Sequence, residues 1–131
     1  MTDAPDDDTL ELAERLFDLA RDGRTEPLTG YVDAGVPVDL TNAKGDTLLI
    51  LAAYHGHPET VAALLARDAD HGRLNDRGQS ALAAAVFKQD APVVTALLAA
   101  GADPDAGAPS AAASAEFFGL PAMTALIEAH R

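Results

Sequence analysis

The sequence contains no cysteine and no tryptophan, and only 5% of its 131 residues are aromatic. The absence of cysteine excludes disulfide bonds and thiolate metal sites. Apolar residues make up 48% of the chain, so a core would be built mainly from alanine, leucine and valine. No apolar run approaches the roughly 20 residues that a membrane span needs. The acidic start, MTDAPDDDTL, does not resemble a signal peptide. We therefore expect a soluble cytoplasmic protein.

Basic residues are also scarce, because nine Lys and Arg face 21 Asp and Glu, for a net charge of −12. Residues 1–39 hold eleven acidic and three basic residues (−8), and residues 40–131 hold ten acidic and six basic residues (−4). Nucleic acids and anionic membrane surfaces repel such a protein. We therefore expect neither as a partner, and the simplest role of the acidic surface is solubility.

One segment of the chain recurs after a shift of 33 residues, so that Asn42–Gly72 overlays on Asn75–Asp105. The matching positions are Gly45 and Gly78, Thr47 and Ser80, Leu49 and Leu82, Ala52 and Ala85, Leu64-Leu65 and Leu97-Leu98, and Asp70 and Asp103. Each copy predicts two short helices: a hydroxyl residue, Thr47 or Ser80, caps the first helix, and in the first copy Pro58 opens the second. Neither helix could bury its apolar face alone, so neighbouring repeats must stack.

This 33-residue period of paired helices resembles the ankyrin repeat family. The resemblance covers about residues 10–131 and implies an all-α solenoid of helix-turn-helix units. Its four repeats would be 10–39, 40–74, 75–105 and 106–131, the first and last being degenerate caps. Residues 1–9 are expected to be a disordered acidic tail, with a cap at Asp8 or Thr9 and a first helix ending at Gly23. The alternative is another helical repeat array, but its 34-residue period and aromatic-rich helices do not match these residues.

The resemblance further implies a concave groove, formed by hairpin tips and the shorter helices, that binds other macromolecules. The candidate partner-binding residues are Lys44, Asp46, Tyr54, His55, Leu74, Arg77, Gln79, Phe87, Lys88 and Phe117. Three of them, Tyr54, Phe87 and Phe117, occupy one position in successive repeats and predict an aromatic ladder. The alternative is that these rings merely cover the seam between helices. Five of the nine basic residues are expected near the groove: Lys44, Arg67, Arg73, Arg77 and Lys88.

Residues with possible catalytic or metal-binding chemistry have simpler explanations. His55 and His57, followed by Asp68, Asp70 and His71, suggest a metal site, but a Gly-His turn is a feature of the family that the chain resembles. A histidine in such a turn more often makes a structural hydrogen bond. The serines at the two helix caps, Ser80 and Ser110, have no histidine base at a plausible spacing. We therefore expect no catalytic residue, no metal and no cofactor.

These observations predict a monomeric, non-catalytic module that binds another protein through its concave groove. The alternative within that class is a dedicated inhibitor or accessory subunit of a single enzyme. A third possibility is an enzyme in its own right, which would need a deep polar pocket with converging titratable groups.

The charge distribution generates the first testable prediction, which is that the protein does not bind duplex DNA specifically. The six basic residues of residues 40–131 are too few and too scattered to follow a phosphate backbone. A fluorescence anisotropy titration over a range of salt concentrations checks this. Salt-sensitive binding with a sub-micromolar dissociation constant would contradict the prediction.

Overall fold

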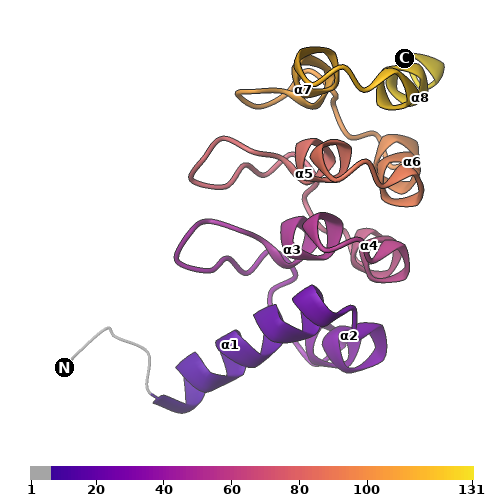
Figure 1. Cartoon of the computed structure of the whole chain (residues 1–131). Coiled ribbons are helices and arrows are strands. Elements are labelled where there is room, and N and C mark those ends of the chain that lie inside the picture. Colours follow the sequence, from indigo (N-terminus) through magenta and orange to yellow (C-terminus); the bar gives the residue numbers. More distant parts are fainter. Residues whose placement is uncertain (1–6) are drawn as a thin grey trace.

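The computed structural model describes residues 7–131, which form a single row of stacked helix pairs (Figure 1). The inner layer consists of α1 (Asp7–Asp22), α3 (Leu48–Tyr54), α5 (Ala81–Phe87) and α7 (Ala111–Phe117). The outer layer consists of α2 (Thr25–Asp33), α4 (Pro58–Leu65), α6 (Ala91–Ala99) and α8 (Pro121–Ala129). Inner helices pack on neighbouring inner helices, and outer helices on outer ones. The described residues contain no strand beyond isolated bridges, which confirms the predicted all-α solenoid.

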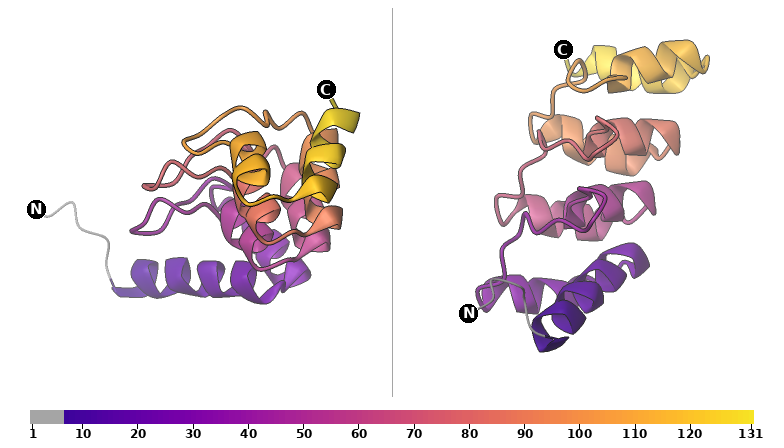
Figure 2. Two further views of the ribbon diagram at one scale, coloured as in Figure 1. Left: turned by 45° about the horizontal axis from the view of Figure 1, so that its top comes forward. Right: turned by 90° about the vertical axis from the view of Figure 1, so that its left-hand side faces the viewer.

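The first helix, α1, is longer than the other inner helices. It has 16 residues, whereas α3, α5 and α7 have seven each, and its N-terminal half projects past the stack on the side of the hairpins (Figure 2). It begins at Asp7, so Asp8 and Thr9 lie inside its first turn rather than at a cap. Of the tail expected at residues 1–9, residues 1–6 lie outside the described part of the chain. No helix within residues 7–131 is long and apolar enough to cross a membrane.

Hydroxyl side chains start three of the inner helices, as predicted for the second and third repeats. Thr47 Oγ1 accepts a hydrogen bond from the Ile50 amide at 3.0 Å, and Ser80 Oγ accepts one from Ala83 at 3.0 Å. Ser110 Oγ does the same for the Ala113 amide at 3.1 Å. Each bond satisfies one of the backbone donors that a helix N-terminus leaves unpaired.

The hairpins between repeats are fixed by two equivalent asparagines. Asn42 Oδ1 accepts from the amides of Lys44 and Asp46 at 2.9 and 3.0 Å. Asn75 Oδ1 accepts from the amides of Arg77 and Gln79 at the same two distances. The Asp76 amide donates to the carbonyl oxygen of Lys44 at 3.0 Å, so adjacent hairpins are also joined to each other. The backbone at the hairpin tips is therefore held in place before any partner arrives.

The core runs through the stack as layers of leucine, valine and alanine. In each of the two repeated Leu-Leu pairs, the first leucine is fully buried: Leu64 and Leu97 are both 0% exposed. At the C-terminal end Met123 is buried and Leu120 is partly buried, whereas Phe118 is 52% exposed. Of these three residues, only Phe118 is largely on the surface.

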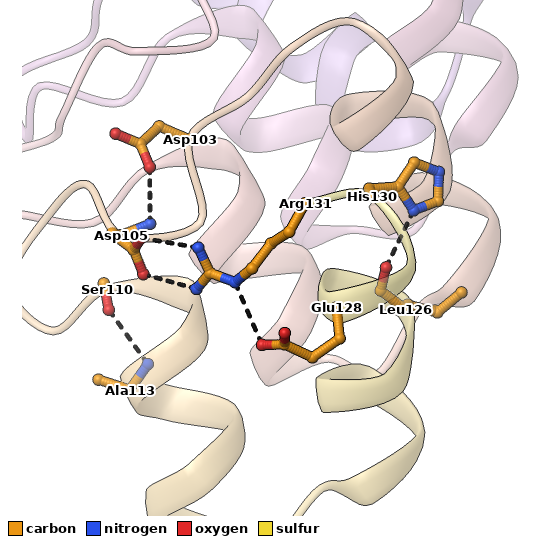
Figure 3. A network of polar contacts seen from close by, with 8 residues as sticks. All are labelled: Asp103, Asp105, Ser110, Ala113, Leu126, Glu128, His130 and Arg131. Atoms are coloured by element: carbon orange, nitrogen blue, oxygen red, sulfur yellow. Dashed lines mark hydrogen bonds and ion pairs between the residues drawn. The ribbon is translucent and has the colours of Figure 1, made fainter.

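The last residue closes the C-terminal repeat. The guanidinium of Arg131 donates to both carboxylate oxygens of Asp105 at 2.9 Å, and its Nε donates to Glu128 at 3.1 Å (Figure 3). This ion pair lowers the pKa of Asp105, chiefly through the side-chain hydrogen bond. The end of α8 is thereby tied to the segment that precedes α7.

The buried leucines generate the second prediction. Leu64→Ala or Leu97→Ala should each lower the free energy of unfolding by about 2–5 kcal/mol, because each leaves a cavity between layers. Chemical denaturation monitored by circular dichroism measures the loss. Leu10→Ala is the control, since Leu10 is 48% exposed and should cost far less. Losses under about half a kcal/mol at both buried sites would show that these helix faces do not form the core.

Candidate functional site

A groove of about 790 Å³ lies between α1 and the hairpins and inner helices that follow it. One wall is a face of α1 made of residues three or four apart: Leu10, Ala13, Glu14, Phe17, Asp18 and Arg21. The opposite side comes from α3 and the hairpin tips. Because α1 extends beneath the hairpins, it closes one end of the concave surface that the shorter inner helices leave open (Figure 2).

Six of the ten predicted partner-binding residues line this groove, namely Lys44, Asp46, Tyr54, His55, Arg77 and Gln79. The other four, Leu74, Phe87, Lys88 and Phe117, are exposed but lie outside its lining. The structure therefore brings together residues from the hairpin at 42–46, from the end of α3 and from the hairpin at 75–79. Leu74 and the residues at the ends of α5 and α7 lie outside this lining.

Two of the groove residues hold the hairpins rather than present free polar groups. The side chain of Asp46 is buried, and its Oδ1 accepts a hydrogen bond from Asn75 Nδ2 at 2.8 Å. Gln79 Oε1 accepts a longer bond from the same nitrogen, at 3.3 Å. Asp46 thus connects its own hairpin to the hairpin that contains Asn75, and its carboxylate is largely inaccessible to a partner.

Aromatic and cationic side chains connect the ends of three inner helices. The Lys88 ammonium lies 4.8 Å from the centre of the Tyr54 ring, and Tyr54 also contacts His55 edge-on at 5.1 Å. Further along the stack, Phe118 makes edge-to-face contacts with Phe87 at 5.8 Å and with Phe117 at 5.0 Å. The predicted ladder positions are thus linked through Lys88 and Phe118.

Phe87 is 48% exposed and Phe117 is 84% exposed. Packing between neighbouring helices therefore buries little of Phe117 and about half of Phe87.

The α1 wall is the part of the groove that sequence reasoning missed. Glu14, Asp18 and Arg21 were not among the predicted partner-binding residues, and they line the groove. Within this wall the Arg21 guanidinium pairs with Asp18 at 2.9 Å. The available signal was a second face on this helix, in which Leu10, Ala13 and Phe17 follow helical spacing.

Arg67 does not belong to the groove, contrary to expectation. Its guanidinium holds both carboxylate oxygens of Asp33, at 2.8 and 3.0 Å, and so joins the ends of α4 and α2 in the outer layer. The hydrogen bonds from Arg67 lower the pKa of Asp33. Arg67 is therefore a link between repeats.

The two histidines of the turn after α3 have different roles. His57 Nε2 lies 2.6 Å from the carbonyl oxygen of Arg21, a hydrogen bond that ties the second repeat to the end of α1 and confirms its expected structural role. His55 lines the groove, where burial and the positive charges of His57, Arg21 and Lys88 lower its pKa. Within residues 7–131 no group of three or more His, Cys, Asp or Glu side chains could hold a metal ion.

A family model described as ankyrin repeats in three copies matches residues 13–108. This chain belongs to the ankyrin repeat family. Members of the family are generally protein–protein interaction modules and are generally non-catalytic. The match begins inside α1 and ends in the hairpin before α7, so it includes all of the groove lining except Leu10.

Three curated relatives extend this assignment. A Pseudomonas aeruginosa protein named as an ankyrin repeat protein is 49% identical over 65 residues, which are 47% of this chain and 38% of that protein. A Treponema pallidum protein named as ankyrin repeat-containing is 37% identical over 93 residues, or 70% of this chain and 31% of that one. An inactive serine/threonine-protein kinase of the mouse is 32% identical over 97 residues, or 74% of this chain and 7% of the kinase. The chain thus spans less than two fifths of the length of each of these relatives.

The contact between α1 and the second repeat generates the third prediction. Gly23 has φ +69°, and a Cβ added there would lie 2.5 Å from the His57 ring. Gly23→Ala should therefore lower the free energy of unfolding by at least about 1–2 kcal/mol, the cost of a left-handed backbone alone. Urea denaturation of the variant measures this effect.

Gly30→Ala is the matched control. Gly30 lies inside α2, its φ is not positive, and an added Cβ would meet nothing within 4 Å. This change should raise stability by about 0.5–1 kcal/mol, because alanine loses less conformational freedom than glycine in a helix. Equal stability changes of the two variants would contradict the role given to the contact between Gly23 and His57.

Proposed function

We propose that this chain is a non-catalytic binding module whose partner protein docks along the groove and the exposed inner-helix ends. The observation that carries this proposal is the preformed backbone of the groove. Asn42 and Asn75 hold their hairpins through equivalent pairs of hydrogen bonds, and the Asp76 amide joins one hairpin to the other. A surface that is already ordered loses little conformational entropy when a partner binds.

The exposed aromatic side chains supply the second argument. Phe87 and Phe117 offer apolar area that no neighbouring repeat covers, and Tyr54 lies in the groove itself. Large rings of this kind often anchor protein interfaces, where one residue can contribute about 2 kcal/mol or more. Charged residues at the edge contribute more to the rate of association than to affinity.

A protein partner also agrees with the charge of the chain. A net charge of −12 opposes binding to nucleic acid and disfavours self-association, so we propose that the chain acts as a monomer. Within this function, a dedicated inhibitor or accessory subunit differs from an adaptor in its effect on the partner. If the captured partner is an enzyme, adding the purified chain to an assay of that enzyme separates the two roles.

The fourth prediction tests the aromatic anchors. Replacing Tyr54 and Phe87 together by alanine should weaken binding of the native partner at least about tenfold, because the partner buries most of their free apolar area. The partner is first captured from cells of the source organism on the immobilised wild-type chain and identified by mass spectrometry. Calorimetry then gives the dissociation constants for the purified pair.

The matched control replaces Glu59 and Thr95, which are exposed residues of the outer helices α4 and α6. Their double alanine variant should bind like the wild type. Thermal melts of all three proteins accompany the titrations. If the Tyr54/Phe87 variant binds normally and melts much earlier, the rings serve the fold and the proposal for them is wrong.

A further inference from the structure

The charged residues of the groove depart from the charge of the rest of the chain. Its lining contains three acidic residues, Glu14, Asp18 and Asp46, and three basic residues, Arg21, Lys44 and Arg77. The groove lining is thus neutral in a chain whose net charge is −12. All of the excess negative charge therefore lies on residues outside the groove lining.

Two of the three acidic residues in the lining, Asp18 and Asp46, already have partners within the protein. Asp18 is paired with Arg21 at 2.9 Å, and the buried carboxylate of Asp46 accepts from Asn75 at 2.8 Å. Lys44 and Arg77 take part in none of the ion pairs found within residues 7–131, and both are exposed. Among the lining residues, the charges outside an ion pair on the hairpin side are therefore Lys44 and Arg77, and on the α1 side Glu14, whereas the exposed Asp76 lies outside the lining.

Lys44 and Arg77 are equivalent residues of successive hairpins. The backbone amide of each donates at 2.9 Å to the asparagine two positions earlier, Asn42 or Asn75. The two hairpins are joined directly, because the carbonyl oxygen of Lys44 accepts from the amide of Asp76. The two cationic side chains thus leave a fixed backbone at a repeat spacing, as a paired site for two anionic groups would require.

We propose that the groove receives an extended acidic peptide segment of the partner, with two carboxylates that pair with Lys44 and Arg77. This inference rests on the proposed function. Neighbouring helices pack about 8–10 Å apart, and an extended polyproline-type chain advances about 3.1 Å per residue with three residues per turn. Carboxylates about three residues apart on such a segment therefore lie on one face at the spacing of the two hairpins.

The overall negative charge does not prevent this pairing. At physiological ionic strength charges separated by more than about 8 Å are largely screened, whereas the two cationic side chains contact their ligands directly. Lys88 is a third cationic group, 4.8 Å from the ring of Tyr54 in the groove lining, and it extends the positive side toward the third repeat. On the α1 wall Asp18 is paired with Arg21, so the unpaired carboxylate of Glu14 favours a peptide whose acidic side chains face the hairpins.

The fifth prediction tests this inference with a display library of random twelve-residue peptides selected on the immobilised chain. Selected peptides should be enriched in Asp and Glu separated by two residues. The double variant Lys44→Glu/Arg77→Glu should bind the strongest of them at least about tenfold more weakly, and should itself select Lys- and Arg-rich peptides. Fluorescence anisotropy with the synthesised peptide measures the change, and raising the salt concentration should weaken wild-type binding of the acidic peptide more than the residual binding of that peptide by the double variant.

The matched control is Arg15→Glu/Arg24→Glu, which reverses two exposed basic residues outside the groove lining. Both double variants change the net charge by −4, from −12 to −16, so only position distinguishes them. The control should retain the acidic peptides. Equal losses for the two variants would mean that bulk charge governs binding and would overturn the inference.

The outcomes also separate this inference from the proposed function. Suppose that the selected peptides have no excess of acidic residues, and that replacing Tyr54 and Phe87 abolishes their binding while reversing Lys44 and Arg77 does not. The inference of an acidic partner segment would then be wrong, and the proposal that the groove binds a partner protein would remain. If neither the wild type nor any variant retains a peptide, and no captured protein depends on the groove, both proposals fail. Circular dichroism melts show that each variant is folded.

Discussion

Short helices that cannot bury their own apolar faces are the constraint on which this structure depends. An inner helix of seven residues is too short to be stable by itself in water. It becomes stable because α3 packs between α1 and α5, and α5 between α3 and α7. Alanine-rich inner helices, such as the run Ala83-Ala84-Ala85, allow these layers to approach closely, and all three residues are at most 3% exposed. Every other feature, including the groove, follows from this regular spacing of layers.

The stack determines where binding can occur. Packing buries the helix faces that meet in the core, and the groove is lined by the hairpin tips, by α3 and by one face of α1. Polar groups within this surface divide into two kinds. Asp46 and Asn75 bond to each other and set the geometry, whereas Lys44 and Arg77 are left without partners within the described residues. Because Lys44 and Arg77 hold the same position in successive repeats, the periodicity of the fold also places two cationic side chains in a row.

Links between repeats outside the core add specificity to the arrangement. Arg67 holds Asp33 across the outer layer, Arg131 holds Asp105 at the C-terminal end, and His57 bonds to the backbone of Arg21. These ion pairs are exposed, so each contributes little to stability. Their effect is to hold the neighbouring repeats in register.

The 33-residue period by itself determined the family, the all-α stack and the helix caps at Thr47 and Ser80, because these are local features that recur in sequence. Six of the groove residues could be named because the resemblance to ankyrin repeats implies a concave surface at the hairpin tips and the shorter helices. Only the tertiary structure decided that Glu14, Asp18 and Arg21 face the groove, since that depends on the angle at which the long helix α1 meets the hairpins. It also decided that Asp46 is buried against Asn75 and that Arg67 pairs with Asp33. Both contacts join residues about 30 positions apart in the sequence, and the repeat pattern does not determine which side chains touch at that separation.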